Sequence, residues 1–241
     1  MPTFRHGKRT VILMDGTNMS PYLNDSTTAN ELEALETTTY GSDDKTYIVG
    51  LGDGTLQMGG LFDGAASASD GVLSGSVFAV EDVALTVMWD GAALGSRAAV
   101  IPAGQLTSYE VSSPVADVVS ISAAVQADGG VQRGVVLASL SAIAASASAT
   151  SVDNGAASAN GATATLHVTA NNRDGTATVK VQHSSDDNVW VDFITFDAVS
   201  ASTTDGQGAS ATGTVNRYLR AINTLAGSSG SVTYTVAAAR R

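Results

Sequence analysis

Residues 31–50 read ELEALETTTYGSDDKTYIVG, and this stretch restricts the fold more than any other. It opens with acidic residues, passes through three threonines and a Tyr-Gly turn, and ends in an alternating strand. So much charge of one sign with so few apolar side chains makes a poor core element. We interpret it as a surface offered to another molecule. It belongs to a long loop predicted over residues 24–46, which includes a short predicted helix at 29–36.

The composition predicts an all-β chain with many turns. Of the 241 residues, 44% are hydrophobic but only 5% are aromatic, so small side chains must build the core. The 25 glycines and the many short Val/Ile/Thr/Tyr runs are typical of short strands joined by turns. We therefore expect one large β domain or two smaller ones.

The first half of the chain shows strand patterns and one helical pattern. Strands are predicted at residues 9–14, 45–51, 55–64 and 84–91 and twice within 107–130, with turns at 15–18 and 52–54. Besides the short helix at 29–36, a helix is predicted over Ser67–Val80, where apolar residues recur at helical spacing and Ser69 or Asp70 can cap.

The composition shifts at residues 138–162, which are almost entirely Ala, Ser, Gly and Asn. We place a domain boundary near Ala145, which divides the chain into residues 1–145 and 146–241. Short strands then resume, with Gly/Asp/Ser clusters between them, at residues 166–169, 177–183, 189–196, 215–222 and 232–236. This pattern predicts a C-terminal Ig-like β-sandwich.

The net charge of −11 is unevenly distributed. Sixteen acidic and six basic residues up to Ala145 give −10, while seven acidic and six basic residues after it give −1. An acidic wall repels DNA within a Debye length of about 8 Å. The charge therefore argues against a DNA-binding protein, but it suits a surface that DNA passes without binding.

No combination of residues supports catalysis, a metal site or a cofactor site. The chain has no cysteine, and its three histidines lack the spacing of metal ligands. Adjacent carboxylates on a strand face opposite ways, so they do not form a glycosidase pair. We predict that the chain is not an enzyme, that His167 is exposed and that Trp190 packs in the core.

The beginning of the chain carries only one short apolar run, VILM at residues 11–14. That run is too short for a signal peptide, and no stretch reaches the length of a membrane span. We expect a protein made in the cytoplasm, without a membrane partner.

Two stretches resemble the major tail tube proteins of long-tailed, siphovirus-like bacteriophages. They are ETTTYGSDDKTYIVGLGDGTLQMGGLFDG at residues 36–64 and TSYEVSSPVADVVSISAAVQADGGVQRGV at residues 107–135. The pieces VQHSSDDNVW (181–190) and NRYLRA (216–221) are similar to an appended domain of the same group. Together these stretches cover 74 of the 241 residues, and they contain structural rather than catalytic residues.

The resemblance implies a virion protein of the tail, assembled in the host cytoplasm. Its copies would form hexameric rings that stack into a tube for genome delivery, with a tail-tube β-sandwich at residues 1–145. The tape measure protein and the tail terminator and distal tail proteins are the implied partners, while DNA passes through unbound. The C-terminal domain would lie on the outer face.

The resemblance also implies where copies contact one another. A loop at about residues 24–46 would reach the next ring and meet the basic N-terminus of a neighbour. The interface residues expected are Arg5, Lys8, Arg9, Glu31, Glu33, Glu36, Thr38, Tyr40, Asp43, Asp44 and Lys45.

Two other functions stay open. The chain could be a capsid decoration or baseplate protein, which would form closed trimers or attach to a shell. It could also be a surface module that binds a carbohydrate through Trp190 and Tyr218.

Overall fold

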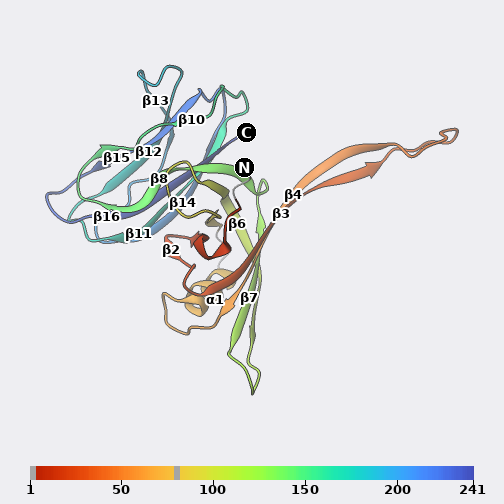
Figure 1. Cartoon of the computed structure of the whole chain (residues 1–241), viewed down its shortest axis with the longest axis horizontal. Helices are drawn as coiled ribbons and strands as arrows, with labels where there is room; N and C mark the ends of the chain where they lie inside the picture. The colour runs from red at the N-terminus through yellow and green to blue at the C-terminus, as the bar shows by residue number, and fades with distance from the viewer. Residues whose placement is uncertain (1–3, 79–81) are drawn as a thin grey trace.

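The computed structural model describes residues 4–78 and 82–241, which form an all-β fold with one short α-helix (Figure 1). The predicted fold class is therefore confirmed. The elements in chain order are η1 (Gly7–Arg9), β1 (Val11–Met14), β2 (Thr17–Asn18), β3 (Leu23–Glu36), β4 (Tyr47–Leu61), α1 (Ser69–Phe78), β5 (Val83–Met88), β6 (Arg97–Ser112), β7 (Ser120–Ala127), β8 (Gln132–Ile143), β9 (Ala147–Ser148), β10 (Val152–Asp153), β11 (Ala162–Asn171), β12 (Ala177–Ser184), β13 (Val191–Thr195), β14 (Asp205–Ala211), β15 (Tyr218–Leu225) and β16 (Val232–Arg240).

The long strand β6 connects two layers of the larger sheet. Its first half pairs with β5 and β8, and its second half pairs with β7, which continues through β4 to β3. The two layers enclose one hydrophobic core, to which Leu56, Leu85, Ile101 and Val125 contribute from four different strands. Helix α1 closes this core with the buried Leu73.

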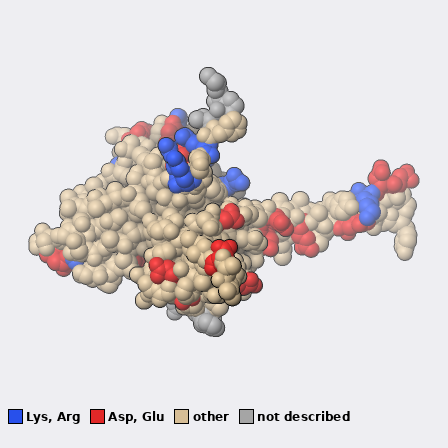
Figure 2. All heavy atoms as spheres, turned by 60° about the horizontal axis from the view of Figure 1, so that its bottom comes forward, with Lys and Arg blue, Asp and Glu red and all other residues tan. Residues whose placement is uncertain are grey.

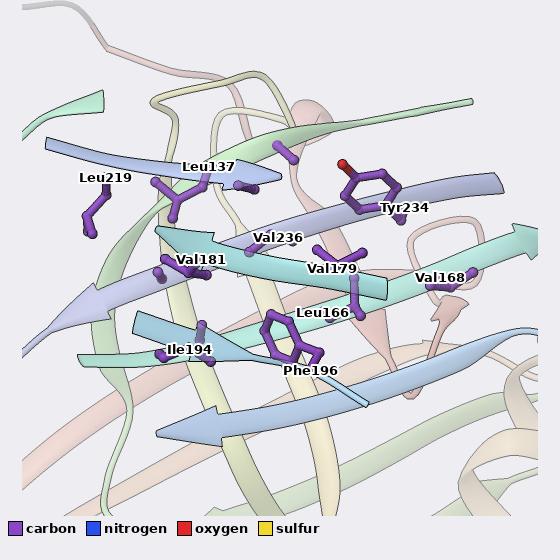
Figure 3. Close-up of a cluster of buried hydrophobic side chains, with 14 of the residues drawn as sticks. Leu137, Leu166, Val168, Val179, Val181, Ile194, Phe196, Leu219, Tyr234 and Val236 are labelled. Atoms are coloured by element: carbon purple, nitrogen blue, oxygen red, sulfur yellow. The ribbon is translucent and has the colours of Figure 1, made fainter. Parts of the chain in front are cut away.

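The C-terminal half forms a second sandwich (Figure 3). One of its layers is the β10–β15–β12–β13 sheet, with β9 beside β15, and the other is the β8–β16–β11–β14 end of the larger sheet. Leu166, Val181, Leu219 and Val236 are fully buried between the layers. Because β16 pairs with both β8 and β11, segments from both sides of Ala145 share one sheet. The division at Ala145 stays a prediction.

The short helix predicted at residues 29–36 is wrong, as is the loop assigned to 24–46. Residues Leu23–Glu36 form strand β3, which pairs with β4 along its whole length. The Glu, Leu and Ala residues favour helix in isolation, but hydrogen bonding to a second strand overrides that weak preference. Only residues 37–46 form the connection between the two strands.

The turn predicted at residues 52–54 is also wrong, because Tyr47–Leu61 is one continuous strand. Glycine is required at position 54 by close packing against a neighbouring segment and not by a turn. A Cβ at this position would lie 2.5 Å from the backbone nitrogen of Val131, so only glycine allows the neighbouring chain to approach so closely.

Other local predictions are confirmed. Helix α1 lies within the predicted range, whose end at Val80 falls outside the described residues. The turn after β1 has positive φ at Asp15 (44°) and Gly16 (76°), as a tight hairpin requires. Ser69 lies at the helix start and tethers it to β4, since its hydroxyl donates to the carbonyl of Leu61.

His167 is fully buried, so its predicted exposure is wrong. It lies on β11, between the two halves of the chain. Its Nδ1 accepts from the backbone N–H of Gly16 (3.4 Å), and its Nε2 lies 2.9 Å from the hydroxyl of Thr86. Exposure was predicted because His167 and the apolar Leu166 point to opposite faces of the strand. In the folded chain both faces of β11 are buried. Burial lowers the pKa of His167 from 6.5 to about 3.

We expect His167 to make folding acid-sensitive. Between pH 6.5 and about 3, the unfolded chain binds a proton at this residue that the folded chain does not. The free energy of unfolding should therefore fall by about 1.4 kcal/mol per pH unit as the pH drops through this window. Urea unfolding at several pH values would measure the slope. In the variant His167→Gln, the free energy of unfolding should depend less steeply on pH in this range. Equal slopes in both proteins would contradict a lowered pKa for His167.

Candidate subunit interface

Strands β3 and β4 continue beyond the body of the molecule as a two-stranded ribbon (Figure 1). Every residue from 30 to 49 is exposed, so neither face of the ribbon is covered. We call residues 30–53 the arm. An isolated two-stranded hairpin is at best marginally stable in water. An uncovered ribbon of this length is therefore a candidate for contact with another molecule.

The two faces of the arm differ in chemistry. Cross-strand partners share a face, and Ala34 pairs with Val49 while Leu32 and Tyr47 lie on the same side as this pair. We call these four residues the apolar face, and Glu36, the partner of Tyr47, lies at its outer end. On the opposite side, Glu31 pairs with Asp53, and Glu33 lies two residues along the strand. We call these three carboxylates the acidic face, and the pair Leu35 and Ile48 lies further out on the same side.

The large apolar side chains of the arm are strongly exposed. The exposed fraction reaches 69% for Leu32, 72% for Val49 and 83% for Leu51. Burying one such side chain completely is worth roughly 1.5–3 kcal/mol. A partner that covered the apolar face would therefore gain several kcal/mol that the isolated subunit leaves unused.

The tip of the arm has a defined conformation. The backbone N–H of Thr46 donates to the hydroxyl of Thr38 (3.1 Å), and Lys45 forms an ion pair with Glu36 at 3.1 Å. Tyr40 stands fully exposed at the turn. Five of the predicted interface residues lie in this connection: Thr38, Tyr40, Asp43, Asp44 and Lys45.

The basic N-terminal segment lies against the body near the start of β3. Arg5 Nε is 3.0 Å from Asp90 Oδ2, and Arg9 shares the same carboxylate at 3.9 Å. Lys8 lines an open hollow of about 530 Å³ together with His6, Leu23 and Trp89. In Figure 2, blue side chains gather beside the N-terminus and red ones follow the arm.

The structure places the predicted interface residues in two groups. Glu31, Glu33 and Glu36 lie on the arm with the five residues of its tip, while Arg5, Lys8 and Arg9 lie on the body. Within the described part of one copy, only Glu36 and Lys45 of this set pair with each other. A contact between the two groups in different copies stays a prediction.

The apolar face of the arm was missed by sequence reasoning. The alternation of Tyr47, Val49 and Leu51 is visible in the sequence, but alternation does not say whether the apolar side meets the chain's own core or another molecule. The exposed apolar end of the β6–β7 hairpin was missed in the same way, although its two strands were predicted. The hairpin carries the exposed Val115 and Val118 at its end and projects from the body in Figure 1.

The face of the β3–β4–β7–β6 layer opposite the core is polar and acidic. Side chains that alternate with the buried ones on β7 are small or polar, such as Ser122. A shallow hollow of about 330 Å³ on this face is lined by Asp25, Gln57, Ser108 and Glu110, among others, with no Lys or Arg among the described lining residues.

Trp190 is half-buried and not a core residue, so its predicted packing is wrong. The guanidinium of Arg220 lies 4.1 Å from its ring centroid and donates to the side-chain oxygen of Gln182. The preceding polar stretch forms the predicted hairpin turn, in which the carboxylate of Asp186 accepts from the backbone N–H groups of Asn188 and Val189.

The described residues contain no group of three or more His, Cys, Asp or Glu that could hold a metal ion. In the same part of the chain, no helix is both long and apolar enough to cross a membrane.

Comparison with known proteins identifies only distant structural likenesses. No family model and no curated protein sequence matches the chain. A chain from the virion of a native gene transfer agent particle is 16% identical, with a TM-score of 0.43, over 54% of this chain and 98% of that one.

Two further structures show the same level of similarity. The Dit protein of phage SPP1, described as a hub adsorption apparatus, is 12% identical with a TM-score of 0.42, over 95% of this chain and 98% of that one. The tube-terminating cap of the anti-feeding prophage is 9% identical with a TM-score of 0.43, over 55% and 92%. All three TM-scores are below 0.5, so these likenesses assign neither a family nor a function to this chain.

Proposed function

We propose that this chain is a structural virion protein whose copies form hexameric rings that stack into a phage tail tube. The observation that carries this proposal is the arm, which is exposed on both faces over residues 30–49. A long, exposed and partly apolar ribbon is unfavourable in water unless a partner covers it.

The geometry favours a second copy of the chain as that partner. The arm and the basic N-terminal segment are different surfaces of opposite charge, and every copy carries both. A contact between two different surfaces is heterologous, and it produces closed rings or open-ended stacks when it repeats. In such an assembly Arg5, Lys8 and Arg9 of one copy would meet Asp43, Asp44 and Glu36 of another.

The side of the β3–β4–β7–β6 layer that faces away from the core, with Asp25 and Glu110, suits the inside of the tube. DNA that slides along a wall with carboxylates and small polar groups, and without cations, is repelled and does not stick. The genome would thus pass through the conduit without specific binding. The C-terminal sandwich would lie on the outside.

The other parts of the proposal follow from the tube. Tape measure, terminator and distal tail proteins would contact the tube at its lumen and ends, and assembly would occur in the host cytoplasm before the tail joins the virion. The chain would act without catalysis or a cofactor.

Electron microscopy of the purified, concentrated protein tests the proposal. We expect open tubes with a regular axial repeat and a central channel. Charge reversal at Arg5, Lys8 and Arg9 should block their formation, because these cations would then repel the arm of the neighbour. As a matched control, reversal of Lys180, which pairs with Asp192 on the C-terminal sandwich, should leave assembly unchanged.

One outcome would contradict the proposal, and another would correct only its interface. Closed trimers or shell-bound particles would identify a capsid decoration protein instead. Normal tubes from the triple variant would remove the N-terminal cations from the interface while leaving the tube itself established.

A further inference from the structure

Three arginines meet on one face of the central sheet, where β8 lies between β6 and β16. Arg97 on β6 is the partner of Val135 on β8, and Val135 is also the partner of Ala238 on β16. Arg133 lies two residues before Val135, and Arg240 two residues after Ala238, so all three guanidinium groups project from the same side. We call Arg97, Arg133 and Arg240 the arginine triad.

No carboxylate in the described residues forms an ion pair with any member of the triad, whereas five of the other cations are paired. Like charges on neighbouring strands repel each other and destabilise the sheet. Three unpaired cations side by side are also unexpected in a chain with a net charge of −11. Their mutual repulsion has no compensating carboxylate among the described residues, which points to an anionic ligand.

The triad surrounds a prepared hollow of about 170 Å³. Arg240 is half-buried and held in place, because its guanidinium donates to the backbone carbonyls of Ala156 and Asn154. Arg133 lies over the ring of Trp89, 5.7 Å from its centroid. Arg97 and Arg133 are exposed, so their charges are accessible to an anionic group from outside.

We propose that the arginine triad binds the acidic face of the arm of a second copy of this chain. The inference rests on the proposed self-assembly and adds a receptor separate from Arg5, Lys8 and Arg9. Each group places three like charges on one face of neighbouring, paired strands. Neither Glu31 nor Glu33 has a cationic partner in the described part of its own copy.

Charge complementarity favours a protein carboxylate over a phosphate as the ligand. The acidic face presents three exposed carboxylates, of which only Asp53 is hydrogen-bonded to the body of its own copy, through Gln126 on β7. A guanidinium pairs with a carboxylate through two parallel hydrogen bonds, and three such pairs would define the register between copies.

Two complementary variants test the proposal in trans. The first, Arg97→Glu with Arg133→Glu, reverses the triad at its two exposed members. The second, Glu31→Arg with Glu33→Arg, reverses the acidic face. Each alone should raise the protein concentration needed for assembly roughly tenfold or more. When the two are mixed, each arm meets an opposite charge on the other variant, so assembly should recover.

The mixture separates contacts between copies from contacts within one. If the triad pairs with the arm of its own copy, mixing restores nothing, while combining all four substitutions in one chain does. That result would overturn the proposal, as would normal assembly of the first variant. Arg241→Glu is the control, since it reverses one arginine just beyond β16 and outside the triad and should assemble normally.

Sedimentation of the same samples measures association between copies, and it therefore tests the triad independently of tube formation. Association of the two variants with each other, but not of either with itself, would support the triad even if the wild-type protein never forms tubes. In that case only the proposed function would fail. Binding of inorganic phosphate by the wild-type protein, with assembly insensitive to both variants, would identify the triad as a phosphate site instead.

Discussion

Replacing Leu32, Tyr47 and Val49 with threonine should abolish assembly while leaving the subunit folded. Threonine keeps the strand, because it is β-branched, but it removes most of the apolar area from the apolar face of the arm. Each of these side chains would contribute roughly 1.5–3 kcal/mol when a neighbour covers it, so the triple variant would lose roughly 5 kcal/mol or more for each contact. Every copy in a tube would lose the same amount.

Stability and assembly should respond separately in this variant. The three side chains are at least half exposed in the subunit, so the free energy of urea unfolding should change by less than about 0.5 kcal/mol per site. Light scattering and electron microscopy would give the concentration at which assembly begins. Val189→Thr with Val191→Thr is the matched control, because both valines are exposed on the C-terminal sandwich. Normal tubes from the arm variant would exclude the apolar face from the interface.

Replacing Arg173 with methionine should cause the largest loss of subunit stability, roughly 3–5 kcal/mol. The arginine is only 4% exposed and has no carboxylate partner in the described residues. Its guanidinium donates instead to the backbone carbonyls of Ala144, Ala226, Gly227 and Gly230. Methionine has a similar length but no donor, so these buried oxygens would lose their hydrogen bonds.

Urea unfolding would measure the effect, with Arg241→Met as a control in which an exposed arginine is lost. Arg173→Lys should fall between wild type and methionine, since one ammonium group cannot reach all four carbonyls. A change of less than 1 kcal/mol in Arg173→Met would show that water replaces the guanidinium at little cost.

Much of the fold could be predicted from local patterns. Residues 107–130 alternate with period two, and the structure shows the two strands with Ile121, Ala123 and Val125 buried. Helix α1 was recognised by its helical spacing. Strand β14, in contrast, was missed because Asp205–Ala211 contains only small and polar residues. Its pairing with β11 supplies the hydrogen bonds that its own side chains do not signal.

The candidate site was predicted in part. The charge of residues 31–50 correctly indicated a segment that does not pack on its own core, and the described structure exposes all of it except the half-buried Gly50. Its form was misjudged, because Glu31–Glu36 has the residue types of a helix and the pairing with β4 is a property of the folded chain. Whether this segment meets another copy stays a prediction.

By itself, the sequence determined the β class, helix α1, the acidic segment and the lack of a recognisable catalytic motif, because these depend on residue type and short-range periodicity. Only the tertiary structure decided what distant residues do together. His167 is buried because a second layer covers its strand, and the arginine triad exists because the registers of β6, β8 and β16 align residues 97, 133 and 240. Strand register is set by contacts between remote segments, and local patterns in the sequence do not contain it.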